Sequence, residues 1–138
     1  MYSKEELKSM MMFAALPSIT VARRKDRNLG YTISLAITIN CYPNEYMPEY
    51  VVRSLRQYGI HSTISTKKND KVLINGFTPI RNLLDMLYSN NYTKMYRYGF
   101  RLEMMMRILP IVEAKKHLTQ SGFDEVLRIV DGEFDVIN

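Results

Sequence analysis

Residues Tyr31–Asn40 read YTISLAITIN, in which tyrosine, isoleucine and leucine alternate strictly with threonine, serine, alanine and asparagine. Successive side chains of a β-strand point to opposite faces of a sheet, so this period of two predicts a strand with one apolar face toward a core. The other face carries only small side chains without charge. Such a face is either open to water or pressed against a ligand, and this strand alone leaves both readings open.

The segments around this strand predict an α+β fold. Ser18–Lys25 pairs with it as a hairpin, and Ile60–Thr66 with Lys71–Asn75 forms a second hairpin. Ser3 and Glu6 make a capping box for a first helix that Pro17 ends. Further helices are expected at Glu45–Tyr58, from Thr78 onward, at about Tyr96–Lys116 and at about Thr119–Val130. We predict one domain over residues 1–138, with the two hairpins forming a four-stranded antiparallel sheet backed by helices.

Composition narrows the class of protein. Cys41 is the single cysteine, so no disulfide forms within the chain, and the spacings of zinc sites are absent. His61 and His117 stand alone, so we expect no metal site and no cofactor. The apolar run Met10–Leu16 is too short to span a membrane and lacks the basic flank of a signal peptide. These features predict an intracellular, cytoplasmic protein without a membrane partner.

The net charge of +5 is concentrated at the two predicted hairpin tips. The first tip contributes +3 and the second +2, while the rest of the chain has equal numbers of acids and bases. Basic tips can be merely solvated or can protect an edge strand. Both tips together favour a nucleic-acid platform, because such a sheet fits the major groove and lysine and arginine contact phosphate. The candidate DNA-binding residues here are Arg23, Arg24, Lys25, Arg27, Thr32, Ser34, Lys67, Lys68 and Lys71.

In order along the chain, these pieces resemble the LAGLIDADG homing-endonuclease family in its single-motif form. The motif helix and following strand correspond to KSMMMFAALPSITV at Lys8–Val21. The similarity extends over nearly the whole chain, through Gly30–Leu35, Val52–Gly59, Ile74–Gly76, Ile80–Leu84 and His117–Phe123.

The resemblance implies a mode of DNA binding. In that family two motif helices pack together and two saddle-shaped sheets lie in the major groove. A single-motif chain would therefore act as a homodimer on a roughly palindromic double-stranded DNA site. The resemblance also places Met11, Ala14 and Ala15 in the seam between the two motif helices. It places Arg97 and Arg101 near the DNA backbone at the two-fold axis.

The motif departs from the family at the catalytic position. The alignment puts Leu16 where the metal-binding acid belongs and Pro17 where a glycine follows. No aspartate or glutamate lies between Glu6 and Asp26, and the mechanism needs carboxylates to hold Mg²⁺. We therefore assign no catalytic residue and favour a degenerate, inactive nuclease fold that binds DNA.

Three other functions stay open at this stage. The first is an active, metal-dependent homing endonuclease with displaced acidic ligands such as Glu103. The second is an RNA-binding splicing cofactor, for which the aromatic and basic run Tyr88–Arg101 would stack on bases. The third is a structural subunit of a larger assembly, with Met10–Met12 and Met104–Met106 as contact sites.

Overall fold

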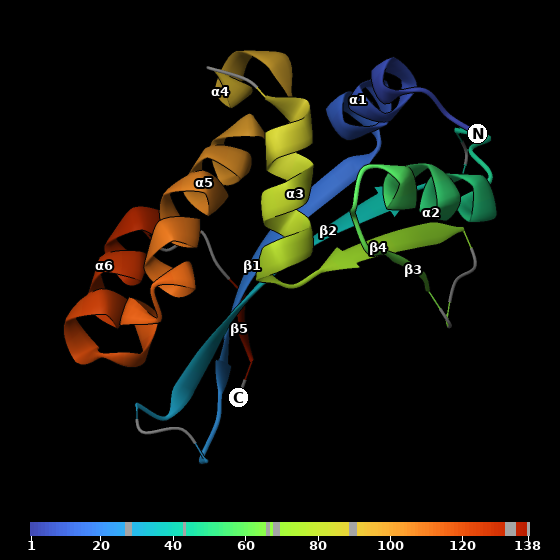
Figure 1. Ribbon diagram of the computed structural model, residues 1–138. Coiled ribbons are helices and arrows are strands. Elements are labelled where there is room, and N and C mark those ends of the chain that lie inside the picture. The colour runs from blue at the N-terminus through green and yellow to red at the C-terminus, as the bar shows by residue number, and fades with distance from the viewer. Residues whose placement is uncertain are drawn as a thin grey trace.

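A five-stranded sheet with helices packed on one face forms the computed structural model, which describes residues 1–26, 29–42, 44–65, 67, 70–88, 91–131 and 135–137 (Figure 1). The strand order is β3-β4-β2-β1-β5, and all neighbours are antiparallel except the pair β1 and β5. The strands are β1 (Ala15–Arg23), β2 (Tyr31–Asn40), β3 (Thr63–Ile64), β4 (Lys71–Asn75) and β5 (Asp135–Ile137). The predicted α+β fold with a four-stranded antiparallel sheet is confirmed, and β5 is an addition that the prediction lacked.

The helices are α1 (Lys4–Phe13), α2 (Pro48–Gln57), α3 (Phe77–Leu87), α4 (Tyr92–Met95), α5 (Gly99–Glu113) and α6 (Gln120–Val130), with the short 3-10 turn η1 (Lys116–Leu118) before α6. The predicted capping box is present, since the Ser3 hydroxyl accepts the Glu6 amide at 3.1 Å and the Ser3 amide donates to the Glu6 carboxylate at 3.0 Å. None of the helices within the described ranges is long and apolar enough to cross a membrane.

The first helix ends earlier than predicted. It stops at Phe13, and the chain enters β1 at Ala15. The Asn40 amide donates a 2.9 Å hydrogen bond to the Ala14 carbonyl, which draws the chain into the sheet at that point. Pro17 lies inside β1, beside the Thr20–Ala22 segment that pairs with β5. Proline lacks the backbone N–H that donates hydrogen bonds between strands, so it is tolerated at a strand position whose N–H would not pair.

Two other predicted helices have different bounds. The one expected at Glu45–Tyr58 begins at Pro48, because Glu45 has a left-handed backbone (φ 63°) and proline favours the first helical position. The one expected at Tyr96–Lys116 is α5, preceded by the separate turn of α4. Gly99 marks the break, since a Cβ there would lie 1.7 Å from the Tyr92 carbonyl oxygen. The second hairpin is also shorter than expected, with two residues in β3.

The core lies between the sheet and the helices. The apolar half of the alternating strand pattern is buried there, as predicted, and joins side chains from the helices. Burying such side chains is the main favourable contribution to folding and fixes which face of each strand remains open. The strand residues in this layer are Ile19, Val21, Ile33, Leu35, Ile37, Ile39, Val72 and Ile74.

Candidate nucleic-acid interface

The face of the sheet that the helices leave uncovered is built from cross-strand rows of small side chains. Strand register sets the rows, because residues paired across strands point to the same face. From one end of the sheet to the other, the rows are Ala22–Thr32, Thr20–Ser34, Ser18–Ala36–Asn75, Leu16–Thr38–Leu73 and Asn40–Lys71. We call this set the open face. Thr32 and Ser34, two of the predicted DNA-binding residues, lie on it.

The open face has the electrostatic character of a surface that accepts a polyanion. Its twelve residues, from β1, β2 and β4, carry no carboxylate, and Lys71 is their single charge, while the register of β5 pairs Asp135 with Thr20. Their side chains are exposed or half-buried, and most are serine, threonine or alanine. The residues of β1, β2 and β4 therefore add no repulsion from acids where a duplex approaches these strands.

The two basic tips lie at opposite ends of this face. Arg24 and Lys25 occupy the turn between β1 and β2, whereas Lys67 precedes β4 in the other hairpin. Lys71 pairs with Asn40, the last residue of β2, so the second tip lies a full strand away from the first (Figure 1). For the ten residues of β2 this separation is about 30 Å. The predicted DNA-binding residues Arg27 and Lys68 fall outside the described residues.

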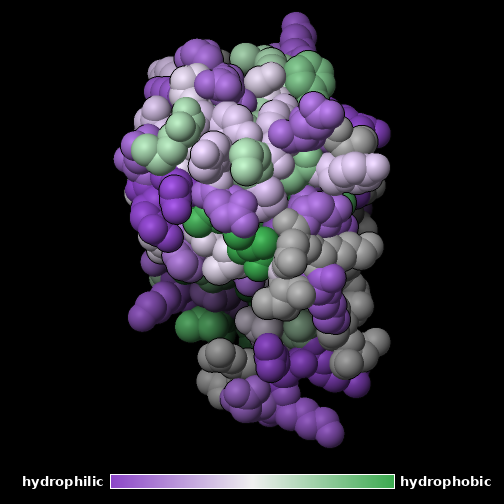
Figure 2. Space-filling view, turned by 90° about the vertical axis from the view of Figure 1, so that its right-hand side faces the viewer, coloured by the Kyte–Doolittle hydropathy of each residue, from purple (hydrophilic) through white to green (hydrophobic). Residues whose placement is uncertain are grey.

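The end of the first hairpin projects from the body of the molecule. Figure 2 shows hydrophilic side chains extending from the lower end, where Figure 1 places the turn between β1 and β2. Arg24 and Lys25 are exposed there, and the Arg24 amide closes the turn with a 2.8 Å hydrogen bond to the Gly30 carbonyl.

Arg23 does not belong to the open face. It continues the series Ile19 and Val21, so the alternation of β1 turns its side chain toward the helical side. Its guanidinium carbon lies 5.9 Å from the centroid of the Tyr31 ring, which stacks in turn on Phe123 of α6. Arg23 is therefore on the other side of β1 from Thr32 and Ser34, and its part in DNA binding stays a prediction.

Arg97 and Arg101 lie beside the junction of α1 and β1. The Arg97 amide donates to the Met12 carbonyl at 3.4 Å, and Nη1 of Arg101 donates to the Pro17 carbonyl at 3.1 Å. Both guanidinium carbons lie 5.4 Å from the centroid of the Tyr98 ring. Arg101 therefore contacts the residue that follows Leu16, through a hydrogen bond that had no signal in the sequence.

The predicted seam residues point into the protein's own core. Met11, Ala14 and Ala15 are only 3%, 4% and 6% exposed, because this side of α1 packs against α2 and β1 of the same chain. These three side chains are therefore covered within a single chain, and their place in a surface between two copies stays a prediction. Phe13 and Leu16, at the same helix-to-strand junction, are 70% and 40% exposed.

Residues that two of the alternative functions would use make other contacts in this structure. The Glu103 carboxylate accepts the amide of Thr93 at 3.2 Å and so serves the first turn of α4. In the part of the chain that the structure describes, no group of three or more histidine, cysteine, aspartate or glutamate residues could hold a metal ion. Tyr92 and Tyr96 are buried against each other with ring centroids 5.7 Å apart, so the aromatic run is not one continuous stacking surface.

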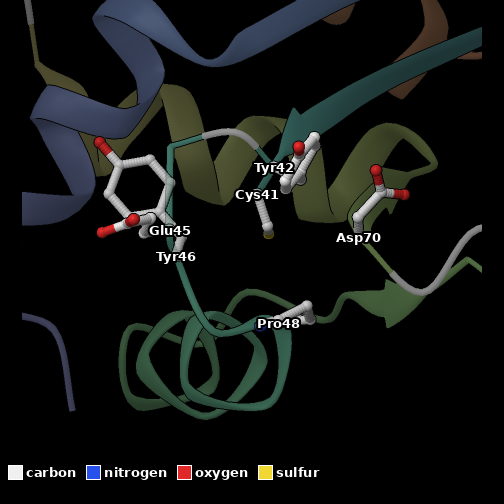
Figure 3. A pocket seen from close by; sticks show the side chains of 6 residues that line it. All are labelled: Cys41, Tyr42, Glu45, Tyr46, Pro48 and Asp70. Atoms are coloured by element: carbon white, nitrogen blue, oxygen red, sulfur yellow. The ribbon is translucent and has the colours of Figure 1, made fainter.

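A pocket of about 390 Å³ lies beyond the end of β2 and was not predicted. Figure 3 shows Cys41 between Tyr46 with Glu45 on one side and Asp70 on the other, with Pro48 below. Its walls are mainly apolar, and burial, followed by the charges of Asp70 and Glu49, raises the pKa of the Cys41 thiol to about 11. A protonated, buried thiol is a poor nucleophile and a poor metal ligand, so Cys41 does not supply this pocket with a nucleophile.

No protein-family model matches the sequence, and no curated protein sequence matches it either. Solved structures do match. The homing endonuclease I-TnaI superposes with a TM-score of 0.69 at 16% identity, over 93% of this chain and 85% of that one. The LAGLIDADG homing endonuclease I-LtrWI, bound to its target DNA, gives 0.68 at 17% identity, over 93% of this chain and 43% of that one.

An archaeal intron-encoded homing endonuclease complexed with DNA matches with a TM-score of 0.70 at 14% identity, over 93% of this chain and 79% of that one. The chain thus spans most of some of these proteins and less than half of I-LtrWI. The chain has the fold of the LAGLIDADG homing endonucleases.

Proposed function

We propose that this protein binds double-stranded DNA as a homodimer and does not cleave it, with residues 1–138 acting as one domain. The observation that carries the proposal is the open face itself, whose residues in β1, β2 and β4 include no acid and which has a basic tip at each end. Solved structures with the same fold are bound to DNA, which supports duplex DNA as the partner.

The dimensions of the open face suit half of a DNA site. The separation of about 30 Å between the tips is close to the length of one turn of B-DNA, roughly 34–36 Å. Arg24 and Lys25 would meet phosphates at the outer end, and Lys67 and Lys71 would meet them at the other end. Thr32 and Ser34 lie between these contacts and face the bases.

The absence of cleavage follows from the residues at the helix-to-strand junction. Leu16 stands where the family resemblance places the metal-binding acid, and a leucine side chain cannot ligate Mg²⁺. The guanidinium of Arg101 lies beside the same junction and adds a positive charge there. A divalent cation is disfavoured next to this group, whereas a DNA phosphate is attracted to it.

Self-association is supported by exposed apolar side chains at the end of α1. Phe13 and Leu16 are the residues of this junction that point away from the core, so we propose them for the surface between two copies. A two-fold axis there would bring the same patch together from both copies, as a closed dimer requires.

The proposal is tested by titrating a fluorescent duplex pool with the protein at several salt concentrations. We expect the unchanged protein to bind, with the logarithm of its binding constant falling linearly with the logarithm of the salt concentration. In the double variant Arg24→Ala/Lys67→Ala the magnitude of this slope should be smaller by about two per chain, because each lost phosphate contact removes roughly 0.9. The matched control is Arg53→Ala/Arg128→Ala, which removes two exposed arginines from α2 and α6 and should leave the slope unchanged.

Two further measurements separate the proposal from its alternatives. Incubation with supercoiled plasmid and Mg²⁺ should leave the plasmid intact, and nicking or linearisation would establish a nuclease instead. Structured RNA should compete less well than duplex DNA. An equal salt slope in the two double variants, or stronger binding to RNA, would contradict the proposed function.

A further inference from the structure

We infer that the open face selects an A·T-rich stretch in the middle of each half-site, with Asn75 pairing to an adenine within it. This inference rests on the proposed binding of double-stranded DNA and adds the class of sequence that is bound. It follows from which side chains the strand register brings to the face and which it leaves out.

The inner rows of the open face lack the groups that read guanine. The commonest specific contact to a G·C pair is a bidentate one from arginine or lysine to O6 and N7 of guanine. Neither arginine nor lysine occurs in the four inner rows, which are Ala22–Thr32, Thr20–Ser34, Ser18–Ala36–Asn75 and Leu16–Thr38–Leu73. The cations lie at the two ends, as Lys71 in the last row and Arg24 beyond the first.

The inner rows do contain groups that suit A·T pairs. An asparagine carboxamide can pair with N6 and N7 of adenine, and Asn75 is exposed on this face beside Ala36. Methyl groups of threonine and alanine contact the C5-methyl group of thymine. Five of the inner residues supply such methyl groups, namely Thr20, Ala22, Thr32, Ala36 and Thr38.

Asn75 is well placed to reach a base because its strand neighbours are small or absent. It pairs with Ala36 on one side, whereas the pairing of β3 with β4 is at Leu73 and Val72. It is also the last residue of β4, where the chain turns at Gly76 into α3. The strand therefore presents a carboxamide at an open position, in contrast to the hydroxyl and methyl groups of the central rows.

The test is selection of binding sites from a randomised duplex pool at one fixed, moderate salt concentration. For the unchanged protein we expect A·T pairs to be enriched in the middle of each half-site. Asn75→Ala should lower the preference for adenine at one position by at least about fivefold, and Asn75→Gln should retain much of it because it keeps the carboxamide. Gln57→Ala removes an exposed carboxamide from α2 and is the matched control.

A gain-of-contact variant makes the test independent of any loss of folding. Ser34→Arg places a guanidinium in an inner row and should create a preference for guanine at one position, by about tenfold. Binding without A·T enrichment would overturn this inference and leave the proposed function standing. An unchanged profile in Asn75→Ala would overturn the role of Asn75. No binding to any duplex would overturn the proposed function itself, and this inference with it.

Discussion

Nη1 of Arg101, at the start of α5, donates a 3.1 Å hydrogen bond to the backbone carbonyl of Pro17, at the start of β1. Among the described residues, β5 pairs with β1 at Thr20–Ala22, whereas the contact at Pro17 comes from a side chain of α5. The contact joins residues that are 84 positions apart and fixes α5 against the sheet.

Replacing Arg101 with methionine should destabilise the fold. The Pro17 carbonyl would lose a charge-assisted hydrogen bond, so we expect the free energy of unfolding to fall by about 1–3 kcal/mol, measured by urea denaturation. Arg97→Met is the control, because Arg97 is exposed and such substitutions typically cost less than about 0.5 kcal/mol. Equal losses in the two variants would mean that the hydrogen bond to Pro17 adds no measurable amount to the free energy of unfolding.

Introducing a charge at Phe13 should prevent self-association. In a symmetric dimer Phe13→Glu would bring two desolvated carboxylates to the same surface, so we expect a monomer in sedimentation velocity at concentrations where the unchanged protein is a dimer. Leu118→Glu, which alters another exposed apolar residue (52% exposed), should leave the sedimentation coefficient unchanged. A monomeric unchanged protein, both free and bound to DNA, would disprove self-pairing.

The ion pair between Arg81 and Glu113 should make a small contribution to stability that depends on pH. Nε and Nη2 of Arg81 donate to the two carboxylate oxygens at 3.1 and 2.6 Å, and the hydrogen bond lowers the pKa of Glu113 below its ordinary value of 4.5. Because the folded-state pKa is depressed, the stabilisation is present above pH 4.5 and is lost as the pH falls below it.

Solvent screening limits its size, since the Glu113 side chain is 42% exposed. We expect Glu113→Gln to lower the free energy of unfolding by at most about 1 kcal/mol at pH 7. The difference from the unchanged protein should shrink as the pH falls below 4.5 and through the lower folded-state pKa of Glu113. A difference that is constant between pH 3 and pH 7 would assign the effect to packing.

Cys41 should resist alkylation in the folded protein. Burial, and then the charges of Asp70 and Glu49, raises its pKa from 9.0 to about 11, which reduces the thiolate fraction at pH 8 by about 100-fold. Iodoacetamide should therefore react at least that much more slowly with the folded protein than with the chain unfolded in urea. Comparable rates would show that the pocket opens in solution.

Much of the sheet was predictable because its signals are local. The period of two in Tyr31–Asn40 predicted the core face of β2, and the hairpin partners followed from adjacent segments. β5 was not predictable in this way. It is three residues long and pairs in parallel with β1, from which it is separated by more than a hundred residues. Parallel pairing across such a distance leaves no pattern near either strand.

The orientation of the candidate site residues was predictable on the strands, where side chains alternate between the two faces of the sheet. It was not predictable on the helices, where packing decides which side chains are buried. Thr32 and Ser34 follow directly from the strand period, and the same rule applied to Ile19 and Val21 would have turned Arg23 away from them. On α1, apolar residues point in several directions. The sequence did not indicate that Ala14 faces the chain's own core while the larger Phe13 faces out.

The position of the two turns at opposite ends of β2 gives the fold a modular way to change the length of its site. Adding two residue pairs at the outer end of β1 and β2 would move the turn that carries Arg24 outward by about 6.8 Å, the rise of two base pairs, and would keep Arg24 on the same face. The contacts around Lys71 would stay where they are, because β4 pairs only with the other half of β2. Hairpin length and footprint length can therefore change together without rebuilding the core.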